Sequence, residues 1–151
     1  MFGTHRVDRP DLGGGRCPIG GRNAAHEAID RHAVGPLKDR PALLWEGRNG
    51  ELETYTYGEL KDLTDRFANL LGSLGMGHGD RTALMMDRIP ELHVSIMGAL
   101  KAGAVAVPIY PALDSTSAKA RLAETGARVL ITQPQHRFRV DDWVPELFDL
   151  D

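Results

Sequence analysis

Two arginines near the end of the chain have the residue type and spacing to bind an anion. Arg137 and Arg139 lie in the segment QPQHRFRVDD, separated by one residue. Two guanidinium groups placed so closely can hold a phosphate through charge-assisted hydrogen bonds. The alternative is that both are solvated charges of a surface tail.

A second candidate is a pair of potential metal ligands near the start of the chain. His26 and Asp30 are four residues apart in HEAID and would share one face of a helix. The pattern is similar to the His-Glu-x-x-His motif of zinc proteases, with Asp30 in place of the second histidine. No third ligand lies at a suitable spacing, so the sequence predicts no metal site.

Two further segments could contact phosphate groups through their backbone. Residues 75–80, GMGHGD, have Asp80 where a dinucleotide-binding loop needs glycine, and they precede a strand, so they predict a helix-to-strand turn. Residues 113–119 follow a strand and open a helix, but they contain no glycine and favour helix capping. Arg121 and Glu124 on that helix predict an exposed ion pair.

Length, composition and charge are those of an ordinary globular domain. The 151 residues are 42% hydrophobic and 26% charged, and 18 basic against 21 acidic residues give a net charge of −3. The basic residues are scattered rather than gathered on one face, which argues against a nucleic-acid partner. We therefore expect no nucleic acid to bind.

Cysteine usage and hydropathy indicate a cytoplasmic protein. Cys17 is the only cysteine, so no internal disulfide can form, and we expect a free thiol in a reducing compartment. No apolar run approaches the ~20 residues that span a bilayer. The N-terminal residues also lack the apolar core of a signal peptide, so no membrane association is expected.

The chain divides into three parts that must position these residues. Residues 1–22 contain six glycines and predict an irregular leader. Residues 23–135 carry regular helix and strand patterns and predict an α/β domain. Residues 136–151 form a tail that has apolar side chains but, like the stretch from residue 133 onward, no clear element.

The first half of the domain predicts a helix, a hairpin and a longer helix. Asn23 is a suitable N-cap for the first helix, Asn49-Gly50 is a hairpin turn, and Thr56 with Glu59 forms a capping box. The long helix carries leucines and one phenylalanine along a single stripe. The expected elements are a helix at 24–33, strands at 42–46 and 52–56, and a helix from 57 that ends at Gly75.

The second half predicts a βαβαβ series with a parallel sheet. Short apolar runs alternate with helical patterns, as in right-handed crossover units. The run at 104–109 shows no alternation, which predicts a strand covered on both faces. The expected elements are strands at 82–86, 104–109 and 128–132, with helices at 90–100 and from 114 or 115 to 126.

Several short motifs occur in an order and spacing that resemble the N-terminal part of acetyl-CoA synthetases and their medium-chain relatives. These belong to the adenylate-forming (ANL) superfamily of AMP-dependent acid–thiol ligases. The resemblance covers roughly residues 20–135 and implies part of the N-terminal subdomain of such an enzyme. The motifs lie at residues 23–32, 55–60, 74–81, 90–92, 101–104, 107–108 and 118–132.

The resemblance also implies which functional parts this chain carries. In the family these segments are scaffold, while ATP and magnesium are held by motifs that this sequence lacks: a Ser/Thr/Gly-rich phosphate loop, an adenine-pocket aromatic motif and a C-terminal lysine. No catalytic residue is therefore expected. Coenzyme A is contacted by arginines just after the strand at 128–132, which implies a CoA-binding role for Arg137 and Arg139.

Three hypotheses about function follow from this resemblance. The chain is a truncated acetyl- or short-chain acyl-CoA synthetase, inactive alone, whose parent reaction converts acid, ATP and CoA to acyl-CoA, AMP and diphosphate. Alternatively, it is a non-catalytic module that docks on the remainder of a split ligase or on a homologous full-length chain. The third is a small CoA- or nucleotide-binding protein that uses Arg137 and Arg139.

Overall fold

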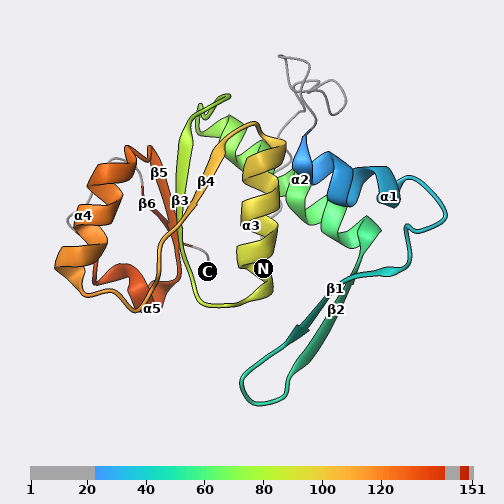
Figure 1. Cartoon of the computed structure of the whole chain (residues 1–151), viewed down its shortest axis with the longest axis horizontal. Helices are drawn as coiled ribbons and strands as arrows, with labels where there is room; N and C mark the ends of the chain where they lie inside the picture. Colours follow the sequence, from blue (N-terminus) through green and yellow to red (C-terminus); the bar gives the residue numbers. More distant parts are fainter. Residues whose placement is uncertain (1–22, 142–146, 150–151) are drawn as a thin grey trace.

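A four-stranded parallel sheet forms the centre of the molecule. The computed structural model describes residues 23–141 and 147–149, and Figure 1 shows the arrangement of its helices and strands. The strands run in the order β4-β3-β5-β6, and each neighbouring pair is parallel. Their bounds are β3 (Arg81–Met85), β4 (Val105–Pro108), β5 (Val129–Thr132) and β6 (Leu147–Asp149).

Helices cover both faces of the sheet. The chain leaves β3 through α3 (Pro90–Lys101) and returns as β4; it then passes through α4 (Ser115–Thr125) to β5 on the other side of β3. In Figure 1, α4 lies on one face and α3 on the other, with α2 (Tyr57–Ser73) behind α3. The predicted α/β architecture with a βαβαβ unit is confirmed.

Successive side chains of the strands point to opposite faces of the sheet, so the protein has two hydrophobic cores. On the first face, Leu84 and Ile131 pack with side chains of α2 and α3, including Phe67 and Val94. On the opposite face, Met85 and its neighbours pack under α4. The second core consists of Ala83, Met85, Ile109, Ala118, Leu122, Ala127, Leu130 and Val140.

The helices begin and end where the local sequence signals place them. The Thr56 hydroxyl accepts from the Glu59 N–H at 3.2 Å, and the Glu59 carboxylate accepts from the Thr56 N–H at 2.8 Å, which completes the capping box. Pro90 occupies the first turn of α3, where its missing N–H has no cost. Gly126 ends α4 in the left-handed conformation, with φ of 61°.

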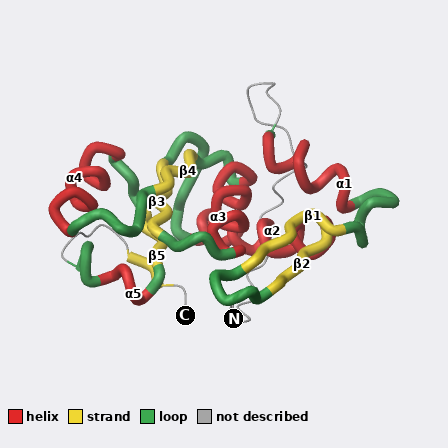
Figure 2. The backbone as a smooth tube through the Cα atoms, turned by 60° about the horizontal axis from the view of Figure 1, so that its bottom comes forward, coloured by secondary structure: helices red, strands yellow, loops and turns green. Residues whose placement is uncertain are grey.

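A short N-terminal helix and a hairpin complete the fold. The Asn23 carboxamide accepts from the N–H groups of Ala25 and His26, and the helix that follows contains a π-helical segment, η1 (His26–Asp30), before α1 (Arg31–Ala33). The antiparallel strands β1 (Pro41–Glu46) and β2 (Leu52–Thr56) project from the body in Figure 1, and in the view of Figure 2 they pass in front of α2.

Two sequence-based predictions were wrong. The two faces of β4 are only partly covered: Ala106 and Val107 pack against the two cores, but Val105 is 44% exposed, and the strand lies at the edge of the sheet. The stretch after residue 133 does contain elements, since α5 (Pro134–Arg137) follows β5 and β6 pairs with it. A strand of three residues is held by backbone hydrogen bonds to its neighbour, so it leaves no side-chain periodicity to detect.

Within residues 23–141 and 147–149, no helix combines the length and the apolar character needed to cross a bilayer. The leader at 1–22, including Cys17, lies outside the described residues.

Replacing each of two buried threonines on the central strands by valine is expected to have opposite effects on stability. Thr82 Oγ1 has no hydrogen-bond partner, whereas Thr132 Oγ1 donates to the Met85 carbonyl at 2.9 Å. Because valine has nearly the same shape, Thr82→Val should raise the free energy of unfolding by about 1 kcal/mol, and Thr132→Val should lower it by about 1 kcal/mol. Urea denaturation of both variants checks this, and a loss of stability in Thr82→Val would contradict it.

Candidate functional site

The carboxyl ends of β3 and β5 define the place in the sheet where a ligand is expected. These strands are neighbours, yet the chain leaves β3 toward α3 and leaves β5 toward α5, after which Val140 packs in the core on the α4 side. Adjacent strands whose connections diverge to opposite faces form a crevice at the carboxyl edge, the usual binding position in open α/β sheets.

Polar side chains from both connections meet at this crevice. The Asp87 N–H, just after β3, donates to Gln133 Oε1 at 2.7 Å. The Gln135 carboxamide donates to the Asp87 carboxylate at 3.2 Å. His136 Nε2 is buried and lies 3.1 Å from Asp87 Oδ1, without a well-aligned hydrogen bond. We call Asp87, Gln133, Gln135, His136 and Arg139 the carboxyl-edge cluster.

Arg139 joins this cluster through the other nitrogen of the imidazole ring. Its Nη1 lies 3.1 Å from His136 Nδ1, and its guanidinium carbon lies 4.4 Å from the centre of the Phe138 ring. The Ser115 hydroxyl donates to the Arg139 carbonyl at 2.8 Å, which ties this segment to the start of α4. Two neighbours, His136 and Phe138, therefore order the Arg139 side chain, and Ser115 holds its backbone.

Arg137, the second predicted CoA ligand, has a different environment. Its Nε lies 3.3 Å from Asp141 Oδ1, one helical turn further on, and both side chains are more than half exposed. The two arginines thus follow the carboxyl end of β5, as the sequence predicted, but they engage different partners. Their contact with CoA stays a prediction.

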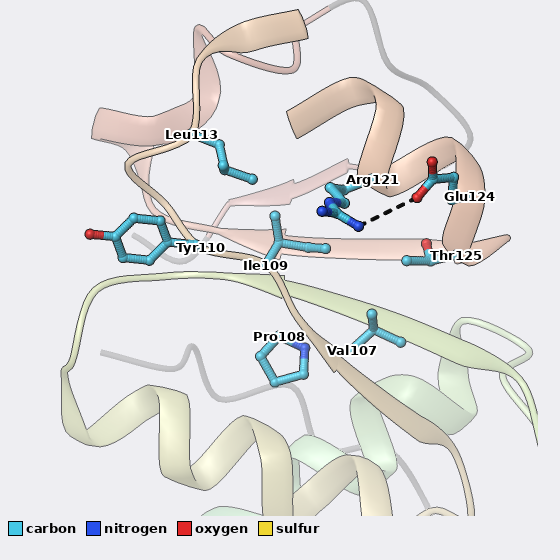
Figure 3. A pocket seen from close by; sticks show the side chains of 8 residues that line it. All are labelled: Val107, Pro108, Ile109, Tyr110, Leu113, Arg121, Glu124 and Thr125. Carbon is cyan, nitrogen blue, oxygen red and sulfur yellow. Dashed lines mark ion pairs between the residues drawn. The ribbon is translucent and has the colours of Figure 1, made fainter. Parts of the chain in front are cut away.

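The structure also has an open groove beside the edge strand. Figure 3 shows it between the end of β4 and α4, with a volume of about 460 Å³. Its floor is mostly apolar, and the rim carries Arg121 and Glu124, whose charged groups are 3.6 Å apart. That pair is the exposed intrahelical pair predicted from the sequence. The lining residues are Val107, Pro108, Ile109, Tyr110, Leu113, Arg121, Glu124 and Thr125.

The two segments that could contact phosphate through their backbone, residues 75–80 and 113–119, have structural roles. Asp80 accepts from the Gly77 N–H and from Arg128, both at 2.7 Å, and the Gly77 bond is the main reason why its pKa lies below the ordinary value. Asp114 accepts from the Ser117 hydroxyl and N–H, and these bonds lower its pKa. The predicted turn and helix cap are both confirmed.

The His26–Asp30 pair takes part in a charge network instead of a ligand set. His26 Nδ1 is 3.7 Å from Asp30 Oδ2, while Lys101 Nζ lies 2.6 Å from Asp30 Oδ1 and 2.8 Å from Asp65 Oδ1. This network connects η1, α2 and α3. Within the described part of the chain, no three His, Cys, Asp or Glu side chains gather as metal ligands.

Sequence reasoning missed Asp87 and His136 as members of the site. One usable signal was present. Asp87 lies two residues after the end of the apolar strand β3, and parallel strands place their carboxyl ends at one edge of the sheet. His136 gave no such signal. It becomes a neighbour of Asp87 because α5 lies next to the carboxyl ends of β3 and β5.

The fold and the crevice define the class of this protein: a doubly wound α/β domain that presents polar groups at the carboxyl edge of a parallel sheet. The family model described as AMP-binding enzyme matches residues 29–149. That match covers most of the 151 residues. The chain therefore belongs to the AMP-binding enzyme family.

Curated relatives and a solved structure agree with this family. The chain is 39% identical over 127 residues to an acetyl-coenzyme A synthetase of Bacillus subtilis, covering 83% of this chain and 22% of that protein. It is 36% identical over 115 residues to a 3-hydroxypropionyl-coenzyme A synthetase of Metallosphaera sedula, covering 76% of this chain and 17% of the relative. The chain thus spans about a fifth of the length of these relatives.

The structural similarity extends over nearly the whole described fold. A crystal structure of an acyl-CoA synthetase from Brucella canis superposes with a TM-score of 0.78 at 28% identity. The superposition covers 85% of this chain and 23% of that one. The matched region corresponds to the N-terminal part of acetyl- and acyl-CoA synthetases, as the sequence motifs predicted.

Proposed function

We propose that this chain provides the N-terminal scaffold and a coenzyme A contact of an AMP-forming acetyl- or short-chain acyl-CoA synthetase. The reaction would join a carboxylic acid to CoA with conversion of ATP to AMP and diphosphate. The groups that adenylate the acid would lie in other parts of a synthetase, in the same polypeptide or in a second one. The chain by itself would be inactive.

One observation carries this proposal: the family match from residue 29 to 149 falls on a parallel sheet with polar side chains at its carboxyl edge. The sequence has no Ser/Thr/Gly-rich phosphate loop after a strand. Adenylation requires preorganised cations and amides around the ATP phosphates. In the described residues, Asp80 accepts a backbone N–H of the helix-to-strand turn before β3, and Asp114 accepts a backbone N–H of the first turn of α4.

A segment exchange tests whether this chain can serve as such a scaffold. The matched segment of the Bacillus subtilis relative is replaced by the corresponding residues of this chain, and acetyl-CoA formation is measured. We expect the chimera to be active. A soluble, folded chimera without acetate-dependent pyrophosphate exchange would contradict the proposal, with the unmodified relative as the positive control.

For the coenzyme, we propose that Arg139 and Arg137 contact the phosphate groups of CoA. The position of both residues after the carboxyl end of β5 supports this, as do the ordering contacts of Arg139. Loss of one charge-assisted contact to phosphate costs about tenfold in affinity. We therefore expect Arg139→Ala to weaken CoA binding about tenfold in calorimetry.

The control for this prediction is Arg31→Ala. Arg31 is an exposed arginine that pairs with Glu27 on the N-terminal helix, far from the crevice in sequence. Its replacement should leave the CoA dissociation constant unchanged. Equal affinities for the wild type and the Arg139→Ala variant would remove Arg139 from the CoA site.

The alternative proposal is a partner module that docks on the remainder of a split ligase or on a homologous full-length chain. The free edge of β4 and the adjacent groove support it, because parallel strands are normally covered on both sides and Tyr110 is 66% exposed here. Light scattering of the chain mixed with the rest of the Bacillus subtilis relative should show a complex. Only separate species in that mixture would count against docking.

We further propose that the protein acts in the cytoplasm. The presence of a single cysteine among 151 residues supports this location. Fractionation of cells that express a tagged chain tests it.

A further inference from the structure

His136 is a buried polar group for which the proposed function has no role so far. It is only 8% exposed, yet its two ring nitrogens face groups of opposite charge. Asp87 Oδ1 lies 3.1 Å from Nε2, and Arg139 Nη1 lies 3.1 Å from Nδ1. Because the imidazole lies between a carboxylate and a guanidinium, its orientation is defined, and we expect it to do more than fill space in the core.

The charge of arginine fixes the protonation of this imidazole. A guanidinium keeps its proton in proteins and has no acceptor, so Arg139 can only donate to Nδ1. Nδ1 must then be unprotonated, and the ring proton is on Nε2. Nε2 lies 3.1 Å from Asp87 Oδ1 without the alignment of a hydrogen bond, and the nearby negative charge favours this tautomer.

Both ends of the Asp87–His136–Arg139 series are held by other parts of the fold. Asp87 is fixed by Gln133 and Gln135, and Arg139 is stacked on Phe138. The bond to His136 uses one of the five N–H donors of the guanidinium, so donors remain for a phosphate. The series therefore orients Arg139 without using up its binding capacity.

We propose that His136, oriented by Asp87, is a positioning residue that holds the Arg139 guanidinium ready for the phosphate groups of CoA. This inference rests on the proposed CoA contact of Arg139. These contacts predict which ring nitrogen has the larger effect on CoA binding. Loss of the acceptor at the Nδ1 position should have the larger effect, because it contacts Arg139. Loss of the donor at Nε2 should act only through the orientation of the ring.

Two substitutions separate the two ring nitrogens. The amide oxygen of asparagine replaces the Nδ1 acceptor, whereas the amide nitrogen of glutamine replaces the Nε2 donor. With the complete chain in calorimetry, we expect His136→Gln to weaken CoA binding about fivefold, because the Arg139 contact is lost. His136→Asn should stay within about twofold of the wild type. Thermal melting of both variants checks that they are folded.

A second readout follows the guanidinium directly and needs no ligand. In NMR spectra, the side-chain N–H protons of Arg139 should exchange slowly with water in the wild type and in His136→Asn. They should exchange faster in His136→Gln. A role limited to core packing would change the melting temperature of both variants without this distinction.

The outcomes distinguish the two proposals. If Arg139→Ala does not weaken CoA binding, the CoA contact is wrong, and the exchange of the Arg139 protons alone then decides the positioning role. If Arg139→Ala weakens binding but the glutamine and asparagine variants behave alike in both measurements, the positioning role is overturned while the CoA contact stands. The predicted difference in both measurements supports the two together.

Discussion

Replacement of Lys101 by methionine is expected to lower the free energy of unfolding by about 3 kcal/mol. Lys101 Nζ contacts three oxygens from two other helices: Asp30 Oδ1 at 2.6 Å, and Asp65 Oδ1 and Thr64 Oγ1, both at 2.8 Å. Its side chain is 12% exposed, against 15% for Asp30 and 29% for Asp65. Removing the cation leaves two carboxylates close together and largely shielded from water.

Lys61→Met is the matched control. Lys61 Nζ lies 2.6 Å from Asp65 Oδ2, but its side chain is 31% exposed and Asp65 keeps Lys101 when it is removed. A partly exposed pair of this kind contributes about 1 kcal/mol or less. Chemical denaturation of both variants gives the comparison, and equal losses would show that the Lys101 network does not hold the three helices together.

The same network gives the stability a pH dependence. Burial raises the pKa of the Asp65 carboxyl, but hydrogen bonds from Lys101 and Lys61 outweigh it, so the net pKa lies below the ordinary 3.8. A depressed carboxyl pKa stabilises the fold above the unfolded value, and this contribution is lost as the pH falls through the folded value. The difference in stability between the wild type and Lys101→Met should therefore shrink below about pH 4.

Replacement of Gly98 by alanine is expected to lower the free energy of unfolding by about 2 kcal/mol, although alanine is the better helix former. Gly98 lies where α3 crosses α2. An added Cβ would be 2.8 Å from Phe67 Cβ and Cδ1 and 3.0 Å from the Thr64 carbonyl oxygen. Phe67 is 2% exposed, and the carbonyl belongs to the helix backbone, so neither neighbour can yield cheaply.

Gly72→Ala separates this crowding from helix propensity. Gly72 lies in the last turn of α2, and an added Cβ there meets nothing within 4 Å. The substitution should stabilise the protein by about 0.5 kcal/mol through propensity alone. A Gly98→Ala variant as stable as Gly72→Ala would mean that the two helices are not in the close contact described here.

The elements with local signals were predictable from the sequence. The Thr56 and Glu59 capping box, Pro90 in the first turn of its helix and the glycine at the end of α4 are interactions within a few residues of one another. They depend little on the rest of the molecule. The exposure of β4 was not predictable in this way, because a strand at the edge and a strand at the centre have similar apolar residues.

The site was predictable only in part, for a related reason. Arg137 and Arg139 could be identified by their type and spacing. The imidazole of His136 and the carboxylate of Asp87 are 49 residues apart in the chain, and they come together through the pairing of β3 with β5. The hydrogen bond of Asp87 to Gln133 depends on the same register. No local sequence pattern indicates that these residues are neighbours in the folded chain.

Acetate-dependent exchange of pyrophosphate into ATP by the purified 151-residue chain tests the central claim most directly. The claim is that this chain supplies a scaffold and a CoA contact, while adenylation belongs to other parts of a synthetase. With magnesium present and the Bacillus subtilis relative as the positive control, we predict exchange no faster than the blank. Exchange above the blank by the chain alone would contradict the account.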